Sequence, residues 1–401
     1  MLVQASSKSG VIESQSAAWG AVLALSLGAF AVVASEFMPV SLLTPIASDL
    51  QITEGQAGQA ISVSGAFAVL TSLFISSVAG QLDRKVLLLV LTGMMIVSGT
   101  IVAIAPNYEL FMLGRALIGV VIGGFWSMSA ATAMRLVPND KVPRALAIFN
   151  GGNALATVIA APMGSFLGGL IGWRGAFFCV VPIAAIVFAW QLMSLPSMKA
   201  EAGKGSGNVF RLLRRPIVAF GMAASALFFM GQFALFTYLR PFLEVVVNVD
   251  VSTLSLLLLL MGVTGFIGTV LIGALLKQGL YRSLIVIPLL MAGIAAALIA
   301  FGGWIAATAL LMGLWGLLAT SAPVGWWTWL ARTLPDDAEA GGGLFVAVVQ
   351  LAITSGATVG GILFDAGGYQ VTFGCSAAIL VVAAVAATVT ARTNRASMIN
   401  R

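Results

Sequence analysis

Long uninterrupted apolar stretches run through nearly the whole chain, and they constrain its fold more than any other feature. A helix that spans the hydrocarbon core of a bilayer needs about 20 consecutive, mostly apolar residues. Twelve such stretches can be drawn. They cover approximately residues 18–45, 56–79, 86–105, 109–136, 143–171, 175–195, 216–243, 252–276, 283–302, 304–331, 341–363 and 370–390. The sequence therefore predicts an all-α integral membrane protein with twelve transmembrane helices.

The composition excludes several other classes of protein. Only 8% of the 401 residues are charged, whereas an ordinary globular domain carries about 25%. A soluble enzyme, a disordered protein and a nucleic-acid-binding module are therefore excluded. Histidine is absent, and Cys179 and Cys375 both lie in apolar stretches. We expect no metal site, no cofactor and no disulfide framework, and the absence of a P-loop pattern leaves ATP-driven transport unsupported.

The basic residues indicate the orientation of the chain. With the N-terminus in the cytoplasm and alternating spans, every Lys and Arg except Arg115, Arg174 and Arg240 falls in a cytoplasmic segment. Positively charged loops face the cytoplasm in membrane proteins. We therefore expect a multi-pass membrane protein with both termini in the cytoplasm.

The longest connection between spans divides the chain into two halves. It holds several glycines and five basic residues, which is typical of a flexible cytoplasmic linker. The predicted organisation is a cytoplasmic tail, a six-helix bundle, the linker, a second six-helix bundle and a second tail. Their limits are residues 1–17, 18–195, 196–215, 216–391 and 392–401.

One acid and one base stand out inside the spans. Helix geometry places Glu36 of the first span and Arg115 of the fourth in the outer half of the bilayer, where the two can meet. Ionisable groups at this depth are costly and usually functional. A nonpolar environment favours the neutral carboxyl, and a nearby guanidinium favours the carboxylate. Proton coupling is the leading interpretation, and a static ion pair or a direct substrate contact are the alternatives.

Other polar and aromatic residues are candidates for a central cavity. Trp126 lies on nearly the same helix face as Arg115, where it either stacks on a planar ligand or packs in the core or against lipid. Arg240 either reaches the outer interface or forms a polar–aromatic stripe with its inward neighbours. Intramembrane amides bond between helices or line a cavity. The remaining candidates are Asn153, Gln232, Phe236 and Gln350, and Pro162 is expected to bend the fifth span or pack tightly there.

A cluster of charges lies on the loop between the second and third spans. Asp83 and Arg84 are followed there by Lys85. The cluster either anchors the loop at the positively charged side or forms a cytoplasmic latch between helix ends.

Several motifs resemble the twelve-span drug:proton antiporter branch of the major facilitator superfamily. Glu36-Phe37-Met38-Pro39-Val40 resembles the first-span motif of that branch, and Leu113-Gly114-Arg115 begins its fourth-span arginine motif. The stretches FWSMSAATAMRLVP, GQFALFTYLRP and PVGWWTWLAR are similar to bacterial purine ribonucleoside efflux transporters. The resemblance assigns proton coupling to Glu36 and Arg115 and a latch role to Asp83 and Arg84.

The resemblance also implies what the chain does. It points to a monomeric secondary exporter of the bacterial inner membrane, not an enzyme, that exchanges protons for inosine, guanosine or related nucleosides by alternating access. Its partners are then a small nucleoside-like solute, protons and the lipid bilayer, with no nucleic acid. The alternatives are export of sugars or amphiphilic drugs by the same fold and, in another class, a membrane enzyme or a non-transporting sensor.

Overall fold

The computed structural model describes residues 17–78, 82–198, 209–335 and 337–399. Nearly all of the predicted N-terminal tail, the middle of the predicted linker and the last two residues of the predicted C-terminal tail lie outside the described residues.

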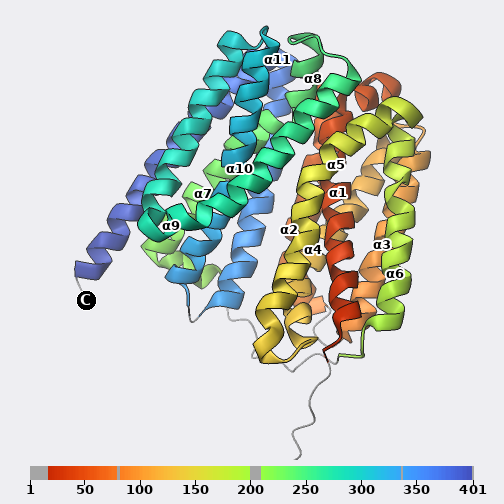
Figure 1. Ribbon diagram of the computed structural model, residues 1–401, viewed down its shortest axis with the longest axis vertical. Coiled ribbons are helices and arrows are strands. Elements are labelled where there is room, and N and C mark those ends of the chain that lie inside the picture. The colour runs from red at the N-terminus through yellow and green to blue at the C-terminus, as the bar shows by residue number, and fades with distance from the viewer. Residues whose placement is uncertain (1–16, 79–81, 199–208, 336, 400–401) are drawn as a thin grey trace, which may run out of the picture.

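The described chain is helical from end to end (Figure 1). The helices are α1 (Trp19–Leu50), α2 (Glu54–Val78), α3 (Arg84–Ile104), α4 (Tyr108–Arg135), α5 (Val142–Phe178), α6 (Val180–Ser194), α7 (Pro216–Phe236), α8 (Leu239–Val245), α9 (Val251–Phe301), α10 (Ile305–Thr333) and α11 (Ala338–Ile399), with short 3-10 turns η1 (Asn139–Lys141) and η2 (Val209–Arg214).

Ten helical stretches of the described residues are long and apolar enough to cross a membrane. Two of these stretches contain a glycine with a left-handed backbone, Gly172 in α5 and Gly368 in α11. The Thr372 hydroxyl donates to the Gly360 carbonyl at 3.3 Å, although a straight helix would separate these residues by about 18 Å. The chain therefore reverses at Gly368. With the corresponding turn at Gly172, the ten stretches give the twelve crossings that the sequence predicts.

The starts of α2 and α4 are capped by short polar side chains. Asn107 Oδ1 accepts from the Leu110 N–H at 3.0 Å at the start of α4. Before α2, Thr53 Oγ1 accepts from the Gln56 N–H at 3.0 Å, and the Thr53 N–H donates to Gln56 Oε1 at 3.0 Å. This reciprocal pair is a capping box, which fixes where α2 begins.

The helices form two halves that lie side by side, α1–α6 and α7–α11 (Figure 1). One hydrophobic core is built mainly from the first half and the other mainly from the second. The cores interlock, because Val40 and Ile61 belong to the second core and Tyr238 belongs to the first. The two halves thus meet through side chains from α1, α2 and the link between α7 and α8.

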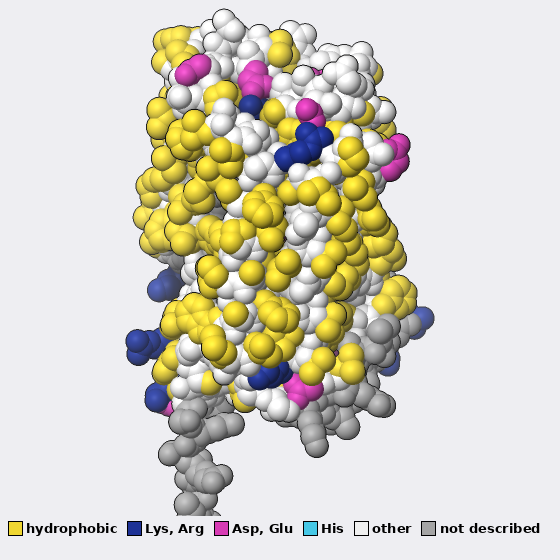
Figure 2. Space-filling view, turned by 90° about the vertical axis from the view of Figure 1, so that its right-hand side faces the viewer, with side chains coloured by type: hydrophobic (Ala, Val, Ile, Leu, Met, Phe, Trp, Pro, Cys, Tyr) yellow, Lys and Arg dark blue, Asp and Glu magenta, His cyan; other side chains and the backbone are white. Residues whose placement is uncertain are grey.

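The outer surface carries a broad apolar belt between two charged ends (Figure 2). Many large hydrophobic side chains are exposed, among them Phe74, Leu170 and Val270 at 58%, 66% and 64%. Apolar exposure on this scale is unfavourable in water and suits a lipid environment. We call the end of the molecule where α1 stops and α2 begins the outer end.

Candidate functional site

The Arg115 guanidinium joins three helices near the outer end of the molecule. The side chain is 1% exposed. Nη1 donates to the Ser35 carbonyl at 2.7 Å, and Nη2 donates to the Glu36 carbonyl at 3.2 Å. From α2, the Ala60 carbonyl accepts from Nε at 3.2 Å and the Ser64 hydroxyl accepts from Nη2 at 3.1 Å. A planar guanidinium can serve several carbonyls at once, so Arg115 ties α4 to α1 and α2.

The Glu36 carboxyl accepts a hydrogen bond from the other half of the molecule. Glu36 and Arg115 are neighbours, as predicted, but Arg115 bonds the Glu36 backbone, and the ion pairs of the described chain do not include these two side chains. Glu36 Oε1 instead accepts from Gln350 Nε2 of α11 at 3.2 Å. Both side chains are 6% exposed. The acid therefore lies at the junction of the two halves.

Aromatic rings surround this junction on the α7 side. Phe37 of α1 stacks on Phe233 of α7 with ring centroids 5.7 Å apart, and Phe236 meets Phe37 edge-on at 6.5 Å. Gln232 precedes Phe233, is partly buried, and its Oε1 has no hydrogen-bond partner. The predicted residues Gln232 and Phe236 thus lie on the helix that contacts α1 beside Glu36.

Arg240 is a bridge between the halves. The side chain is 5% exposed, so it does not reach the outer interface. Its Nη2 lies 2.7 Å from Glu244 Oε1, and Nη1 donates to the Ser41 carbonyl of α1. Burial of a charge requires such partners, and here they fix α8 against α1.

Small polar side chains join α2 to α11 between the membrane centre and the outer end. The Thr358 hydroxyl donates to Ser62 Oγ at 2.8 Å and lies 3.3 Å from Gln59 Oε1. The Ser62 hydroxyl donates to the Thr354 carbonyl at 3.2 Å. We call this set, Gln59, Ser62, Thr354 and Thr358, the outer seam. The sequence analysis missed it, although the spacings of three and four residues put each pair on one helix face.

Asp365 closes the outer seam at its exposed end. Its Oδ2 accepts from the Thr53 hydroxyl at 2.6 Å, and its Oδ1 accepts from the Gly55 N–H at 3.0 Å. A carboxylate at a helix N-terminus is stabilised by the unpaired amides and the helix dipole. Asp365 therefore caps α2 from the opposite half, and the structure is closed at its outer end.

Asp83 lies at the start of α3, outside the spans. Its Oδ1 accepts from the Lys85 N–H at 2.7 Å and from the Met198 N–H at 3.1 Å, and Ser197 Oγ donates to Oδ2. These hydrogen bonds, the one from Ser197 above all, hold the pKa of Asp83 below its usual value. The Arg84 N–H donates to the Met198 carbonyl at 2.9 Å. Asp83 and Arg84 thus join the start of α3 to the segment after α6, within the first half.

The other predicted residues lie on α4 and α5 of the first half. Trp126 meets Phe125 and Phe149 edge-on, each at 6.0 Å. Pro162 is buried inside α5, which continues through it without a non-helical residue at that point. Asn153 of α5 is partly buried.

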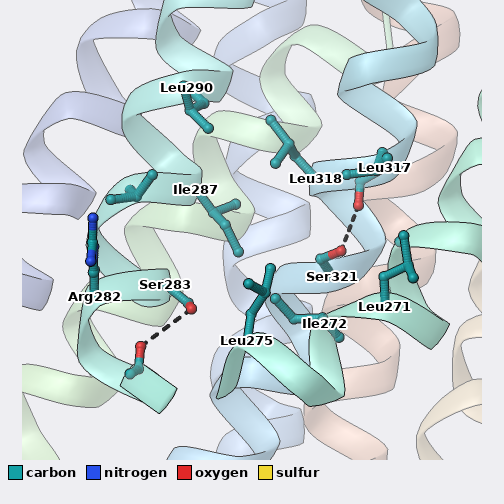
Figure 3. Close-up of a pocket in the computed structure, with 13 residues that line it drawn as sticks. Leu271, Ile272, Leu275, Arg282, Ser283, Ile287, Leu290, Leu317, Leu318 and Ser321 are labelled. Atoms are coloured by element: carbon teal, nitrogen blue, oxygen red, sulfur yellow. Dashed lines mark hydrogen bonds between the residues drawn. The ribbon is translucent and has the colours of Figure 1, made fainter. Parts of the chain in front are cut away.

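The α9 helix bends at Gly279, whose backbone is non-helical. A cavity of about 480 Å³ lies away from the residues above, between α10 and the two parts of α9 on either side of Gly279 (Figure 3). Its lining is mostly leucine and isoleucine. Ser283 and Ser321 bond to their own helices, as the dashed lines in Figure 3 show. Arg282 is the charged residue of the lining. Because the serines are used internally and the rest is apolar, this cavity does not offer a polar solute directed hydrogen bonds.

The Major Facilitator Superfamily profile matches residues 25–352. The chain is 65% identical over 382 residues to the protein named transcription regulatory protein OpdE of Pseudomonas aeruginosa, covering 94% of this chain and 95% of that protein. It is 43% identical over 347 residues to the purine ribonucleoside efflux pump NepI of Salmonella paratyphi B, covering 86% and 87%.

A solved structure shares the fold. The inward-facing, unoccupied crystal structure of a bacterial homologue of the human lysosomal transporter Spinster superposes with a TM-score of 0.78. The match covers 94% of this chain and 97% of that one, at 16% sequence identity.

Proposed function

The chain belongs to the Major Facilitator Superfamily, and from this premise we propose that it is a proton-driven antiporter that exports purine ribonucleosides across the bacterial inner membrane. At the coarser level it is a multi-pass secondary transporter of that superfamily. The proposal adds the direction, the coupling ion and the cargo, and it takes the working unit to be a monomer. The two halves, with limits at 18–195 and 216–391, are the bodies that rock about a central site.

The observation that carries the proposal is the location of Glu36. A carboxyl that is 6% exposed and touches both halves can sense which half-to-half arrangement is present. Intramembrane acids in such positions are costly to keep unless they act on an ion pathway. We assign proton binding to Glu36, and the support of its helix to Arg115, whose two hydrogen bonds to the Ser35 and Glu36 carbonyls fix the α1 backbone at Glu36.

The purine ribonucleoside cargo is supported by the 43% identical relative NepI. The rings of Phe37, Phe233 and Phe236 offer apolar faces beside the junction, and a planar base stacks favourably on such faces. Gln232 Oε1, which lacks a partner, can accept a hydrogen bond from a ribose hydroxyl. Asn153 and Trp126 remain candidates on the α4–α5 side, and sugars or amphiphilic drugs remain the alternative cargo.

The 65% identical relative OpdE supports a second candidate function. The name of that protein describes transcription regulation, and under this candidate the present chain also alters gene expression. Twelve apolar crossings leave the described residues without a soluble domain of the usual DNA-binding size. Under this candidate the effect is indirect, because a change in the cytoplasmic concentration of a transported solute changes expression.

Transport of inosine in proteoliposomes tests the proposal. Purified protein is reconstituted, a pH gradient is imposed, and labelled inosine movement is followed for the native chain, for Glu36→Gln and for Glu109→Gln, an exposed acid at the outer start of α4. We expect gradient-driven inosine flux that Glu36→Gln uncouples and Glu109→Gln leaves intact. No flux of inosine or guanosine under any gradient would reject the cargo, and coupling that survives Glu36→Gln would reject the mechanism.

A further inference from the structure

Gln350 makes a hydrogen bond that uses only half of its amide. Its Nε2 donates to Glu36 Oε1 at 3.2 Å across the junction. Its Oε1 is buried and has no hydrogen-bond partner. A buried acceptor without a donor is unfavourable, and most such groups in folded proteins are satisfied. The orphan oxygen of Gln350 therefore calls for a donor beside Glu36.

The chemistry of the two side chains identifies that donor. A carboxylate only accepts hydrogen bonds, so ionised Glu36 cannot satisfy an amide oxygen. A protonated carboxyl has one O–H donor and one carbonyl acceptor, which match the oxygen and the NH₂ of a primary amide in two parallel bonds. The same result follows if the oxygen and nitrogen of the Gln350 amide exchange places. Gln350 Oε1 would then face Glu36 Oε1, and two oxygen acceptors can bond to each other only if one of them carries a proton.

The other groups around Glu36 do not replace the proton. Among the described residues, Arg115 of α4 is the charged group that faces the Glu36 carboxyl. Its hydrogen bonds go to three backbone carbonyls and the Ser64 hydroxyl, in the first half. The α7 side presents the ring of Phe233 to α1. A bond to Gln350 Oε1 is thus left to the acid of Glu36 itself.

We propose that Gln350 is a positioning residue whose bonding to Glu36 depends on the protonation state of that acid. When Glu36 carries its proton, the two side chains form an acid–amide pair with two hydrogen bonds, and this pair stabilises the outer-closed arrangement. A proton from water on the outer side binds the carboxylate and is released to cytoplasmic water. Loss of that proton orphans the amide oxygen and weakens the link between α1 and α11. This inference rests on the proposed function, since it gives the coupling residue Glu36 a partner.

The direction of the effect agrees with export. The structure is closed at its outer end by Asp365 and by the outer seam. A ligand shifts a conformational equilibrium toward the state that binds it better. If the proton is that ligand and the outer-closed state binds it better, protonation from outside favours return of the empty carrier to the side from which cargo is taken up.

The test uses outside labelling of a cysteine placed in the seam. Ser62→Cys is introduced together with Cys179→Ala and Cys375→Ala in the full chain, reconstituted without cargo. Ser62 is 5% exposed in the outer-closed state. Its reaction with a membrane-impermeant maleimide is measured across external pH, and each rate is divided by that of a Gln370→Cys reference, an exposed position in the outer turn of α11. This ratio removes the pH dependence of the thiol reaction.

We expect the normalised rate to rise about fivefold or more from acidic to alkaline buffer. Gln350→Met, which keeps the size and removes both hydrogen-bonding atoms, should abolish that rise, and so should Gln350→Asn, which withdraws the amide by one methylene group. Gln191→Met, the matched control at a fully buried glutamine of α6, should keep it. A native pH profile in either folded Gln350 variant would overturn the inference, and so would a flat profile in the unsubstituted Gln350 background.

The assay needs no cargo, so its result is separate from that of inosine transport. If inosine does not move but the labelling follows pH through Gln350, the cargo is wrong and the acid–amide pair stands. If inosine transport is proton-coupled and Gln350→Met leaves both coupling and labelling unchanged, the proposed function stands and the inference falls.

Discussion

Replacement of Asp365 by alanine should open the outer end of the protein. Asp365 links the halves through two hydrogen bonds, from the Thr53 hydroxyl at 2.6 Å and the Gly55 N–H at 3.0 Å. The α2 helix keeps its own cap, because the reciprocal bonds of Thr53 and Gln56 do not involve Asp365. The substitution therefore changes the contact between the halves without removing the start of a helix.

The size of the effect follows from the two lost bonds. A hydrogen bond contributes about 0.5–1.5 kcal/mol net, and the exposed setting of Asp365 places each bond toward the lower end of that range. The expected loss is about 1–2 kcal/mol of the free energy that favours the outer-closed state, which is a factor of about 5–30 in the equilibrium.

Outside labelling of Ser62→Cys measures this shift, with Cys179 and Cys375 replaced by alanine. The rate should rise by about the same factor in Asp365→Ala, because labelling requires the transiently open state. Glu109→Ala is the control, an exposed acid at the same end that belongs to α4. Equal labelling rates in the two variants would refute the assignment of Asp365 as a link between the halves.

Three further predictions concern other parts of the structure. Gly58→Ala should also open the outer end, because the added Cβ would lie 2.7 Å from the ring carbon Cζ of Tyr238, which is fully buried. Overpacking of this kind costs about 1–3 kcal/mol, and an unchanged rate of Ser62→Cys labelling would contradict the prediction. Arg115→Lys should have a thermal unfolding midpoint well below that of the exposed control Arg282→Lys. A Lys ammonium cannot replace the several donors of the planar guanidinium, and each buried carbonyl left without a donor costs about 1–3 kcal/mol. A thiol-reactive dye that labels Cys179 and Cys375 reports unfolding, and equal midpoints in the two variants would contradict this role of Arg115. The bonds that lower the pKa of Asp83 make its carboxylate stabilising above the pKa that Asp83 has in the unfolded chain, and this contribution is lost as pH falls through the lower pKa of the folded state. Hydrogen-exchange protection of the Lys85 and Met198 amides should therefore be greater in the native chain than in Asp83→Asn at neutral pH, and the two should converge in strong acid. Equal protection at neutral pH would count against Asp83 as a latch.

The sequence predicted the membrane architecture because that architecture depends on summed properties of long segments. Hydropathy over about 20 residues is insensitive to the exact position of any one side chain. The reversals at Gly172 and Gly368 fall between predicted spans for the same reason. Individual partners depend on helix rotation, which periodicity leaves open by tens of degrees. Glu36 and Arg115 were thus predicted as neighbours, whereas the hydrogen bond that Gln350 of the opposite half donates to Glu36 was not.

The outer seam was missed because its residues carry no intrinsic signal. Ser62, Thr354 and Thr358 are common in membrane helices, where their hydroxyls usually bond to their own backbone. Only the approach of α2 to α11 turns these hydroxyls into links between the halves. Arg240 illustrates the same limit, because its burial depends on the Ser41 carbonyl of a helix distant in the sequence.

The composition of the outer seam makes its closure reversible. Its bonds join hydroxyl, amide and carbonyl groups, and water can replace each partner when the halves separate, so rupture trades one hydrogen bond for another at small net cost. A seam of interlocking leucines would instead expose apolar surface to water when the halves separate, at a free-energy cost of about 25 cal/mol for every Å². A polar closure of this kind suits a carrier that must open and close once in every cycle without becoming trapped.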